Sequence, residues 1–129
     1  MINQKRRYTA ETRKGFVGQS ALVKLDQSGF ITFWSEEAEQ LYGYLLDEMI
    51  GKHFASLFCG GELQQGRAAY ELIAADSRQA YFAFGWQLRK NGQQFWTYSE
   101  STRTESGFEI LVEETTQSAT NQPYLEEIR

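Results

Sequence analysis

The chain has 129 residues and a formal net charge of −4, with one cysteine and one histidine. This length suffices for one domain whose core needs no metal or disulfide. Cys59, as the single cysteine, excludes an internal disulfide, and the single histidine excludes a multi-histidine metal site and a Ser-His-Asp arrangement. The acidic balance argues against a nucleic-acid partner, and no apolar run is long enough to span a bilayer, so we expect a soluble, cytoplasmic domain.

Residues 1–19 differ from the rest of the chain because they are basic, with five Lys or Arg against one Glu. A basic leader of this kind is usually solvated or docked on an acidic body. We therefore interpret residues 1–19 as a leader that forms a cap or a helix, and we expect no nucleic-acid contact.

Two short strands are predicted at residues 21–26 and 29–35, joined by a polar turn that carries Asp26 and Gly29. Asp favours turns because its side chain bonds to nearby backbone, and Gly tolerates positive φ. Ser35 is placed to cap a helix, since its hydroxyl can accept from a free backbone N–H, and the two glutamates that follow suit the positive end of the helix dipole.

A short helical turn is predicted at residues 53–58, and paired glycines separate it from a longer helix at residues 62–75. In the longer helix, apolar or small residues recur at three- and four-residue spacing, which predicts one buried face. The residues of this predicted face are Leu63, Gly66, Tyr70 and Ile73.

Three further strands are predicted at residues 81–88, 94–102 and 108–113. The Asn91-Gly92 step between the first two is a strong hairpin signal, because both residue types tolerate positive φ. The order of elements predicts an α+β fold: a five-stranded antiparallel sheet with short helices and one longer helix on one face.

Several ordered motifs resemble those of PAS domains, over about Ser20 to Thr116. The turn Arg89-Lys90-Asn91-Gly92, followed by Phe95-Trp96, is similar to the family's Arg-Lys-Asp-Gly turn and its following aromatic pair. Glu114-Thr115-Thr116 lies where the family commonly ends in Asp-Ile-Thr. The resemblance divides the chain into a leader at residues 1–19, a PAS domain at residues 20–116, and a linker at residues 117–129.

The C-terminal stretch 117–129 is predicted to begin a signalling helix at Pro123, because proline is pre-set for the first helical position. A helix this short is marginal alone in water. We therefore expect the chain to be part of a longer sensor whose linker helix continues into an output domain.

The resemblance implies a non-catalytic sensory module of a bacterial-type signal transduction protein, such as a two-component system. Such modules bind a small ligand or cofactor between sheet and helices and pass the signal through flanking helices to a kinase, cyclase or regulator. Others join protein partners, and from the aromatic sheet face described below we expect a homodimer. A small enzyme with Glu100 or Glu109 as general base is the third hypothesis, but no nucleophile–base pair accompanies these carboxylates, so we expect no enzymatic activity.

Two residues bear on the cofactors that the family binds. The light-sensing flavin branch needs a cysteine where this chain has Phe54, which excludes that photochemistry, and Cys59 is expected to be a buried structural thiol. Haem-binding PAS domains use one histidine, so His53 is a candidate axial ligand, although a capping role is commoner at the start of a short helix. The cofactor is unknown; flavin is favoured over haem.

The predicted inner face of the last strands is unusual for the family. Matched to the family pattern, the residues that face the helices are small or polar instead of bulky: Ala83, Gly85, Gln87, Thr97, Ser99 and Ser101. Each lost aliphatic side chain forgoes about 1.5–3 kcal/mol of burial, so we expect a flavin ring, a small carboxylate or ordered water in the space. The candidate contacts are Gln87, Thr97 and Ser99, with Phe54, Tyr70 and Leu57 as apolar walls and His53 beside them.

A shift of one residue would exchange the two faces of the sheet. An ordinary core without a pocket would then form from Phe82, Phe84, Trp86, Leu88, Trp96 and Tyr98. In the family register these aromatics form an outer patch, covered by a second subunit or by the N-terminal segment with Phe16 and Val17 as plugs. The alternative function is therefore a ligand-free interaction module that dimerises its parent protein through the aromatic sheet face.

Overall fold

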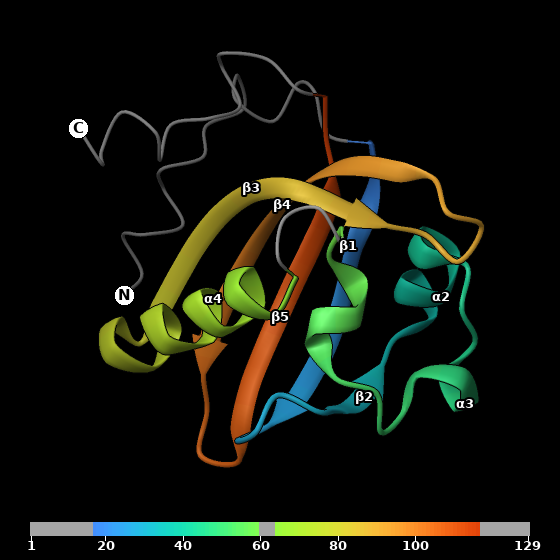
Figure 1. Cartoon of the computed structure of the whole chain (residues 1–129). Coiled ribbons are helices and arrows are strands. Elements are labelled where there is room, and N and C mark those ends of the chain that lie inside the picture. Colours follow the sequence, from blue (N-terminus) through green and yellow to red (C-terminus); the bar gives the residue numbers. More distant parts are fainter. Residues whose placement is uncertain (1–16, 60–63, 117–129) are drawn as a thin grey trace.

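The structure is a computed structural model that describes residues 17–59 and 64–116 (Figure 1). Residues 1–16 of the predicted leader, with Phe16, and the predicted linker at residues 117–129 lie outside the described residues, and both stay predictions. In chain order the elements are β1 (Val17–Asp26), β2 (Ile31–Trp34), α2 (Glu36–Tyr42), α3 (Leu46–Met49), η2 (Phe54–Leu57), α4 (Gln64–Arg78), β3 (Ala80–Leu88), β4 (Gln94–Arg103) and β5 (Gly107–Glu114).

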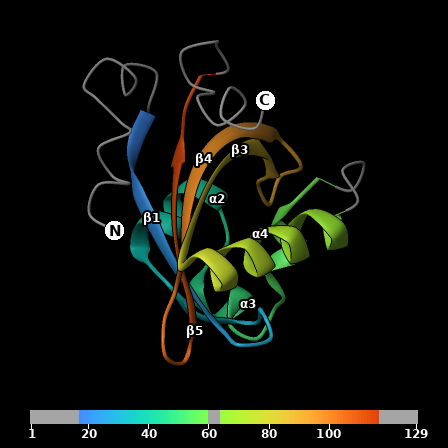
Figure 2. The same cartoon turned by 90° about the vertical axis from the view of Figure 1, so that its left-hand side faces the viewer.

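The five strands form one antiparallel sheet in the order β2-β1-β5-β4-β3. The first and last strands of the chain are neighbours in its interior, with Val23 opposite Ile110. The sheet carries α4 on one face, as the view along its edge shows (Figure 2). The predicted α+β fold is confirmed.

Local signals place the turns and the first helix cap. The Asp26 carboxylate accepts from the backbone N–H groups of Ser28 (2.9 Å) and Phe30 (3.0 Å), and Gly29 has a φ of 92°. The Ser35 hydroxyl accepts from the Ala38 N–H at 3.1 Å, which caps α2 as predicted.

The β3–β4 hairpin turns through Gly92, which has a φ of 89°, whereas Asn91 keeps a negative φ. The Gly92 N–H donates to the Arg89 carbonyl and the Arg89 N–H donates to the Gln93 carbonyl, both at 2.9 Å. The turn is therefore longer than a two-residue loop, and the left-handed conformation is needed at the glycine alone.

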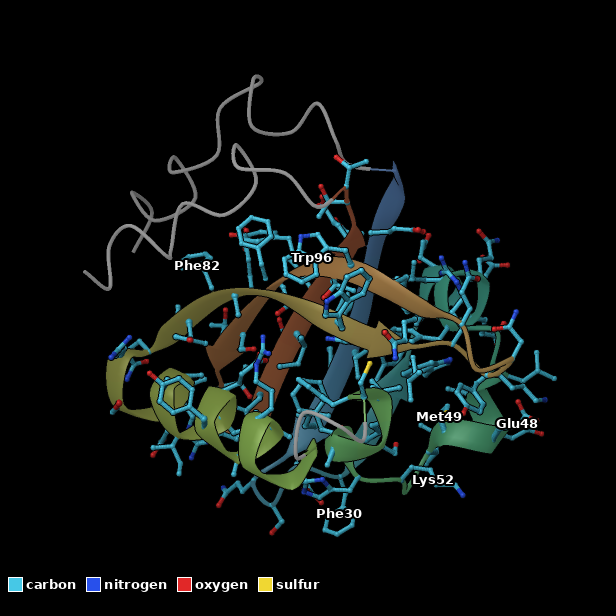
Figure 3. All side chains as sticks on the ribbon, turned by 45° about the horizontal axis from the view of Figure 1, so that its top comes forward. Phe30, Glu48, Met49, Lys52, Phe82 and Trp96 are labelled. Atoms are coloured by element: carbon cyan, nitrogen blue, oxygen red, sulfur yellow. The ribbon has the colours of Figure 1, made fainter. Side chains whose placement is uncertain are left out.

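The sheet presents its small and polar residues to the helices. Gln87 bonds to Tyr42 of α2, and Gly85 lies under Arg67 of α4, so the odd-numbered residues of β3 face inward. Phe82 and Trp96 lie on the opposite side of the sheet from α4 (Figure 3). The alternative register, with Trp86 and Trp96 in the core, is wrong.

The core between helices and sheet is built mainly from β1, β5 and the short helices. Its members are Ala21, Val23, Leu25, Ile31, Trp34, Ala38, Tyr42, Met49, Phe54, Leu57, Phe58, Ala68, Ala75, Phe95, Phe108, Ile110 and Val112. Cys59 is also buried, as expected of a structural thiol.

Helix α4 packs on the sheet through a different face from the predicted one. Ala68, Ala74 and Ala75 are buried, together with the carboxylate residue Glu71, whereas Tyr70 and Ile73 are 52% and 66% exposed. Gly66 is exposed as well, and Leu63 lies outside the described residues. The prediction of the buried face is wrong because small alanines, and not the large apolar residues, make the close contact with the sheet.

Candidate ligand-binding site

The candidate site lies where α4 crosses the inner face of β3 and β4. The strand residues at this place are small or polar and fully buried, among them Ala83, Gly85, Thr97, Ser99 and Ser101. Such residues leave more space under a helix than the aliphatic side chains of an ordinary core. Side chains of α4 therefore reach deep toward the sheet.

Arg67 of α4 lays its guanidinium over Gly85. A Cβ at Gly85 would lie 2.4 Å from Nη2 of Arg67, so the glycine is what admits the guanidinium. Nη2 donates to the Phe84 carbonyl at 2.8 Å, and the group also lies over the Phe58 ring, 5.7 Å from its centroid. One backbone oxygen and one aromatic face thus hold a cation against the sheet.

Glu71, one helical turn after Arg67, supplies the opposite charge. Nε of Arg67 donates to Oε2 of Glu71 at 2.9 Å, and the Glu71 side chain is only 1% exposed. Oε1 of Glu71 is buried and, among the described residues, has no hydrogen-bond partner. Burial raises the pKa of Glu71, and the Arg67 guanidinium opposes that rise.

A second buried polar contact joins α2 to β3. The Tyr42 hydroxyl donates to Oε1 of Gln87, and both side chains are almost completely buried. Burial, with the Glu71 carboxylate, raises the pKa of Tyr42 far above its ordinary value, so the phenol keeps its proton and remains a donor. The rings of Trp34 and Phe95 lie 5.1 Å and 5.5 Å from the Tyr42 ring and fix its position.

The predicted contacts come together in part. Gln87, Thr97 and Ser99 are all buried on the inner face, and Thr97 donates to the Gly85 carbonyl at 3.0 Å. Phe54 and Leu57 of η2 are fully buried. Tyr70 does not form a wall of the site, because half of its side chain is exposed and its ring packs edge-on against Tyr81 at 5.6 Å.

Arg67 and Glu71 were not among the predicted site residues. Their spacing of four residues, which puts both on one helix face, was the available signal. That signal becomes specific only beside the small residues of β3 and β4, since an arginine–glutamate pair on a helix is usually exposed to solvent.

His53 caps η2 through its ring. Nδ1 accepts from the Ala55 N–H at 3.0 Å, which leaves Nε2 as the protonated nitrogen, and Nε2 lies 3.1 Å from the Ser28 carbonyl. Phe30 packs edge-on against the ring at 4.9 Å. Both ring nitrogens are therefore engaged in local contacts, and the candidate role of His53 as a haem ligand stays a prediction.

We expect His53→Ala to lower the free energy of unfolding by about 1 kcal/mol, because an orphan N–H at the start of η2 loses its acceptor. Urea denaturation would measure the change, and His53→Asn, which retains a side-chain acceptor, serves as the matched control. A Soret band in the native protein that disappears in His53→Ala would contradict the capping role.

A separate open hollow lies on the surface between α3 and η2. It has a volume of about 380 Å³ and is lined by Tyr44, Glu48, Met49, Lys52 and Ser56 (Figure 3). Glu48 at its rim pairs with Lys90 at 2.7 Å, and this hydrogen bond lowers the pKa of Glu48. Because this ion pair is exposed to water, it defines a solvated rim and not a closed site.

No family model matches the sequence. The chain is 33% identical over 99 residues to "Two-component system protein A" of Emericella nidulans, a match that covers 74% of this chain and 14% of the relative. The chain thus spans about one seventh of the length of that curated relative.

Solved structures share the fold more completely. A PAS domain from Colwellia psychrerythraea is similar with a TM-score of 0.66 and 21% identity, over 89% of this chain and 96% of that one. The PAS domain of the Cronobacter turicensis quorum-sensing receptor RpfR, in complex with BDSF, has a TM-score of 0.61 and 19% identity, over 79% and 97%. The described residues have an α+β fold with a five-stranded antiparallel sheet. This fold is that of the PAS domain.

Within the described part of the chain, no helix has the length and apolar character needed to cross a membrane. The described residues also contain no cluster of three or more His, Cys, Asp or Glu side chains arranged to hold a metal ion.

Proposed function

We propose that the chain is a non-catalytic sensory PAS module of a signal transduction protein, and that it binds a small ligand between α4 and the inner face of the sheet. The observation that carries the proposal is the partly buried Arg67–Glu71 pair over Gly85, in which one buried carboxylate oxygen has no partner among the described residues.

A buried ion pair contributes little to stability compared with apolar side chains of the same volume, because both charges lose their hydration. The inner space of this domain is nevertheless lined with charge and hydrogen-bonding groups. Oε1 of Glu71 and the Ser101 hydroxyl are both buried and, within the described residues, unpartnered. Unsatisfied buried groups of this kind favour a site that a polar ligand completes.

A path from the site to the strand ends supports the signalling part of the proposal. Arg89 donates to the Leu41 carbonyl at 2.7 Å, next to Tyr42, and to the Glu114 carboxylate at 2.9 Å, at the end of β5. Its guanidinium also lies 4.0 Å from the centroid of the Phe95 ring. A ligand that displaces Tyr42 would therefore shift the group that holds the end of β5, and so bias the adjoining segment between two arrangements.

The names of two similar proteins support a signalling and ligand-binding role. The curated relative is named as a two-component system protein, and the RpfR domain is described as a receptor in complex with BDSF. We propose that this module likewise acts in the cytoplasm within a longer chain, whose output domain is a kinase, cyclase or regulator.

Mass spectrometry of the denatured protein tests the proposal directly. The freshly purified chain is expected to release a small molecule, and Arg67→Gln is expected to release at least tenfold less. Arg78→Gln, an exposed arginine of the same helix, is the control and should release the native amount. An absorbance spectrum of the native protein identifies a flavin or a haem. Failure to release any molecule, with no thermal shift across a metabolite library, would reject the proposal.

A second candidate function is dimerisation through the outer face of the sheet, which carries a cluster of aromatic rings. Trp86 and Trp96 pack edge to face at 5.0 Å, and Phe82 and Tyr98 are stacked at 6.3 Å. Phe82, Trp86 and Trp96 keep part of their surface exposed. Aromatic faces of this kind are common in protein interfaces because each ring buries a large area. We propose a second copy of this chain as the occupant.

Sedimentation velocity tests the dimer. We expect the native chain to sediment as a dimer at micromolar concentration, and Trp86→Glu to sediment as a monomer, because a carboxylate would be desolvated in the interface. Phe33→Glu, at an aromatic of β2 that is 41% exposed, should stay dimeric. A native protein that remains monomeric at high concentration would count against the dimer.

A further inference from the structure

We infer that the ligand of this site is a small zwitterion, a molecule such as an α-amino acid that carries an ammonium and a carboxylate a few bonds apart. The inference rests on the proposed function, and it concerns the chemical class of the ligand. It follows from the charges of Arg67 and Glu71, which lie side by side and each keep hydrogen-bonding capacity.

The cationic half of the site is Arg67. Nε is bonded to Glu71 and Nη2 to the Phe84 carbonyl, whereas Nη1 makes no hydrogen bond to a described residue. The side chain is 24% exposed, so a solute can reach the guanidinium. A carboxylate that approaches Nη1 would form the short, charge-assisted hydrogen bonds that guanidinium groups prefer.

The anionic half is Glu71. Its Oε1 atom is buried without a donor among the described residues, and a carboxylate oxygen in that position needs an N–H or O–H from a ligand. An ammonium group offers three N–H donors. The unpartnered Ser101 hydroxyl on the same inner face of the sheet adds a further polar group for the ligand.

Charge balance separates a zwitterion from simpler ions. A plain carboxylate would place two carboxylates against one guanidinium in a buried site, which requires one of them to take up a proton. A plain amine would place two cations against one carboxylate. A zwitterion adds one charge of each sign, so that every buried charge keeps an opposite neighbour.

Space limits the ligand to a small one. The guanidinium already fills the place of a Cβ at Gly85, and the neighbouring inward-facing pair of the β3–β4 ladder, Ala83 and Ser99, is also small. A ligand that displaces the guanidinium from Gly85 would occupy a space about as large as the guanidinium itself. Amino acids with short side chains match this scale.

Isothermal titration calorimetry of the full chain at pH 7 and fixed ionic strength tests the inference. The zwitterions are glycine, alanine and serine; the matched single-charge compounds are acetate, propionate, lactate, methylamine and ethylamine. At least one zwitterion is expected to bind at least tenfold more tightly than every matched compound. Arg67→Gln and Glu71→Gln should each weaken that binding at least tenfold. Arg78→Gln and Asp76→Asn, at exposed positions of α4, should leave it unchanged.

The other outcomes show whether the ligand class or the assigned site is wrong. Circular dichroism first establishes that the variants are folded. If a plain carboxylate binds as tightly as the zwitterions or more tightly, and its binding strengthens as the pH falls, the inference of a zwitterionic ligand is overturned and the sensory proposal remains. The release of a molecule of another class on denaturation would have the same meaning. Zwitterion binding that survives Glu71→Gln in a folded protein would overturn the assigned site. If nothing binds and nothing is released, both proposals fall.

Discussion

Replacement of Arg67 by glutamine is expected to lower the free energy of unfolding by about 3 kcal/mol at pH 7.5, because the substitution leaves the Glu71 carboxylate buried without its cation. The contacts that would be lost are the 2.9 Å ion pair with Glu71 and the 2.8 Å hydrogen bond to the Phe84 carbonyl. Urea denaturation measures the change, and Arg78→Gln provides an exposed arginine control on the same helix.

The loss of unfolding free energy caused by Arg67→Gln should become smaller as the pH is lowered. Burial raises the pKa of Glu71, so the folded chain holds a proton that the unfolded chain releases, and stability falls as the pH rises between the two pKa values. Without the guanidinium the folded pKa rises further, and this window extends to higher pH. Arg67→Gln is therefore expected to regain stability, relative to the native protein, between pH 7.5 and pH 5.

The double variant Arg67→Gln/Glu71→Gln removes the titrating group and is the control for this pH dependence. It should be more stable than Arg67→Gln at pH 7.5, and the difference between them should narrow toward pH 5. Parallel stability–pH curves for Arg67→Gln and the double variant would contradict the assignment of the effect to Glu71.

Gly107→Ala is expected to lower the free energy of unfolding by about 3 kcal/mol through a clash with backbone. A Cβ at Gly107 would lie 2.0 Å from the Leu25 carbonyl oxygen and 2.6 Å from the carbonyl carbon of Asp26. Gly107 is paired with Asp26 across the β1–β5 ladder, so the clash can be relieved only by separating the two strands.

Gly51→Ala is the matched control for Gly107→Ala, and both are measured by urea denaturation. Gly51 has a φ of 90°, but a Cβ added there would have nothing within 4 Å, so alanine should cost only about 1 kcal/mol for the left-handed conformation. Equal losses at the two positions would mean that the clash at Gly107 is relieved without disturbing the ladder.

Much of the fold could be predicted because its signals are local. Asp26 bonds to the turn that follows it, Ser35 caps the next helix, and Gly92 supplies the left-handed residue of the hairpin. Each of these residues acts within about four positions of its own place in the chain. Such effects can be read from the sequence because no distant partner is needed.

The inner face of the sheet could be predicted only from the family resemblance. Alternation along β3 and β4 fixes which residues share a face, but it does not decide which face meets the helices. Both faces of the sheet carry buried aromatic side chains, since Phe95 lies on the inner face and Phe84 on the outer face. The choice of face depends on distant partners, such as Tyr42 for Gln87.

The central ion pair was missed for a related reason. Hydrophobic periodicity points to Tyr70 and Ile73 of α4, yet both are exposed and Glu71 between them is buried. The burial of Glu71 depends on Gly85, far along the chain, which admits its partner Arg67. A charged pair becomes internal only when the facing strand has room for it, and a single helix does not contain that information.

The adjacency of β1 and β5 has a consequence for any longer polypeptide that contains this domain. The start of β1, at Val17, pairs with the end of β5, at Glu114, so the chain enters and leaves the sheet on adjacent strands about 5 Å apart. Preceding and following modules would be tethered at nearly the same point. A slide of one strand past the other would displace the two attachment points along the sheet and so move one module relative to the other.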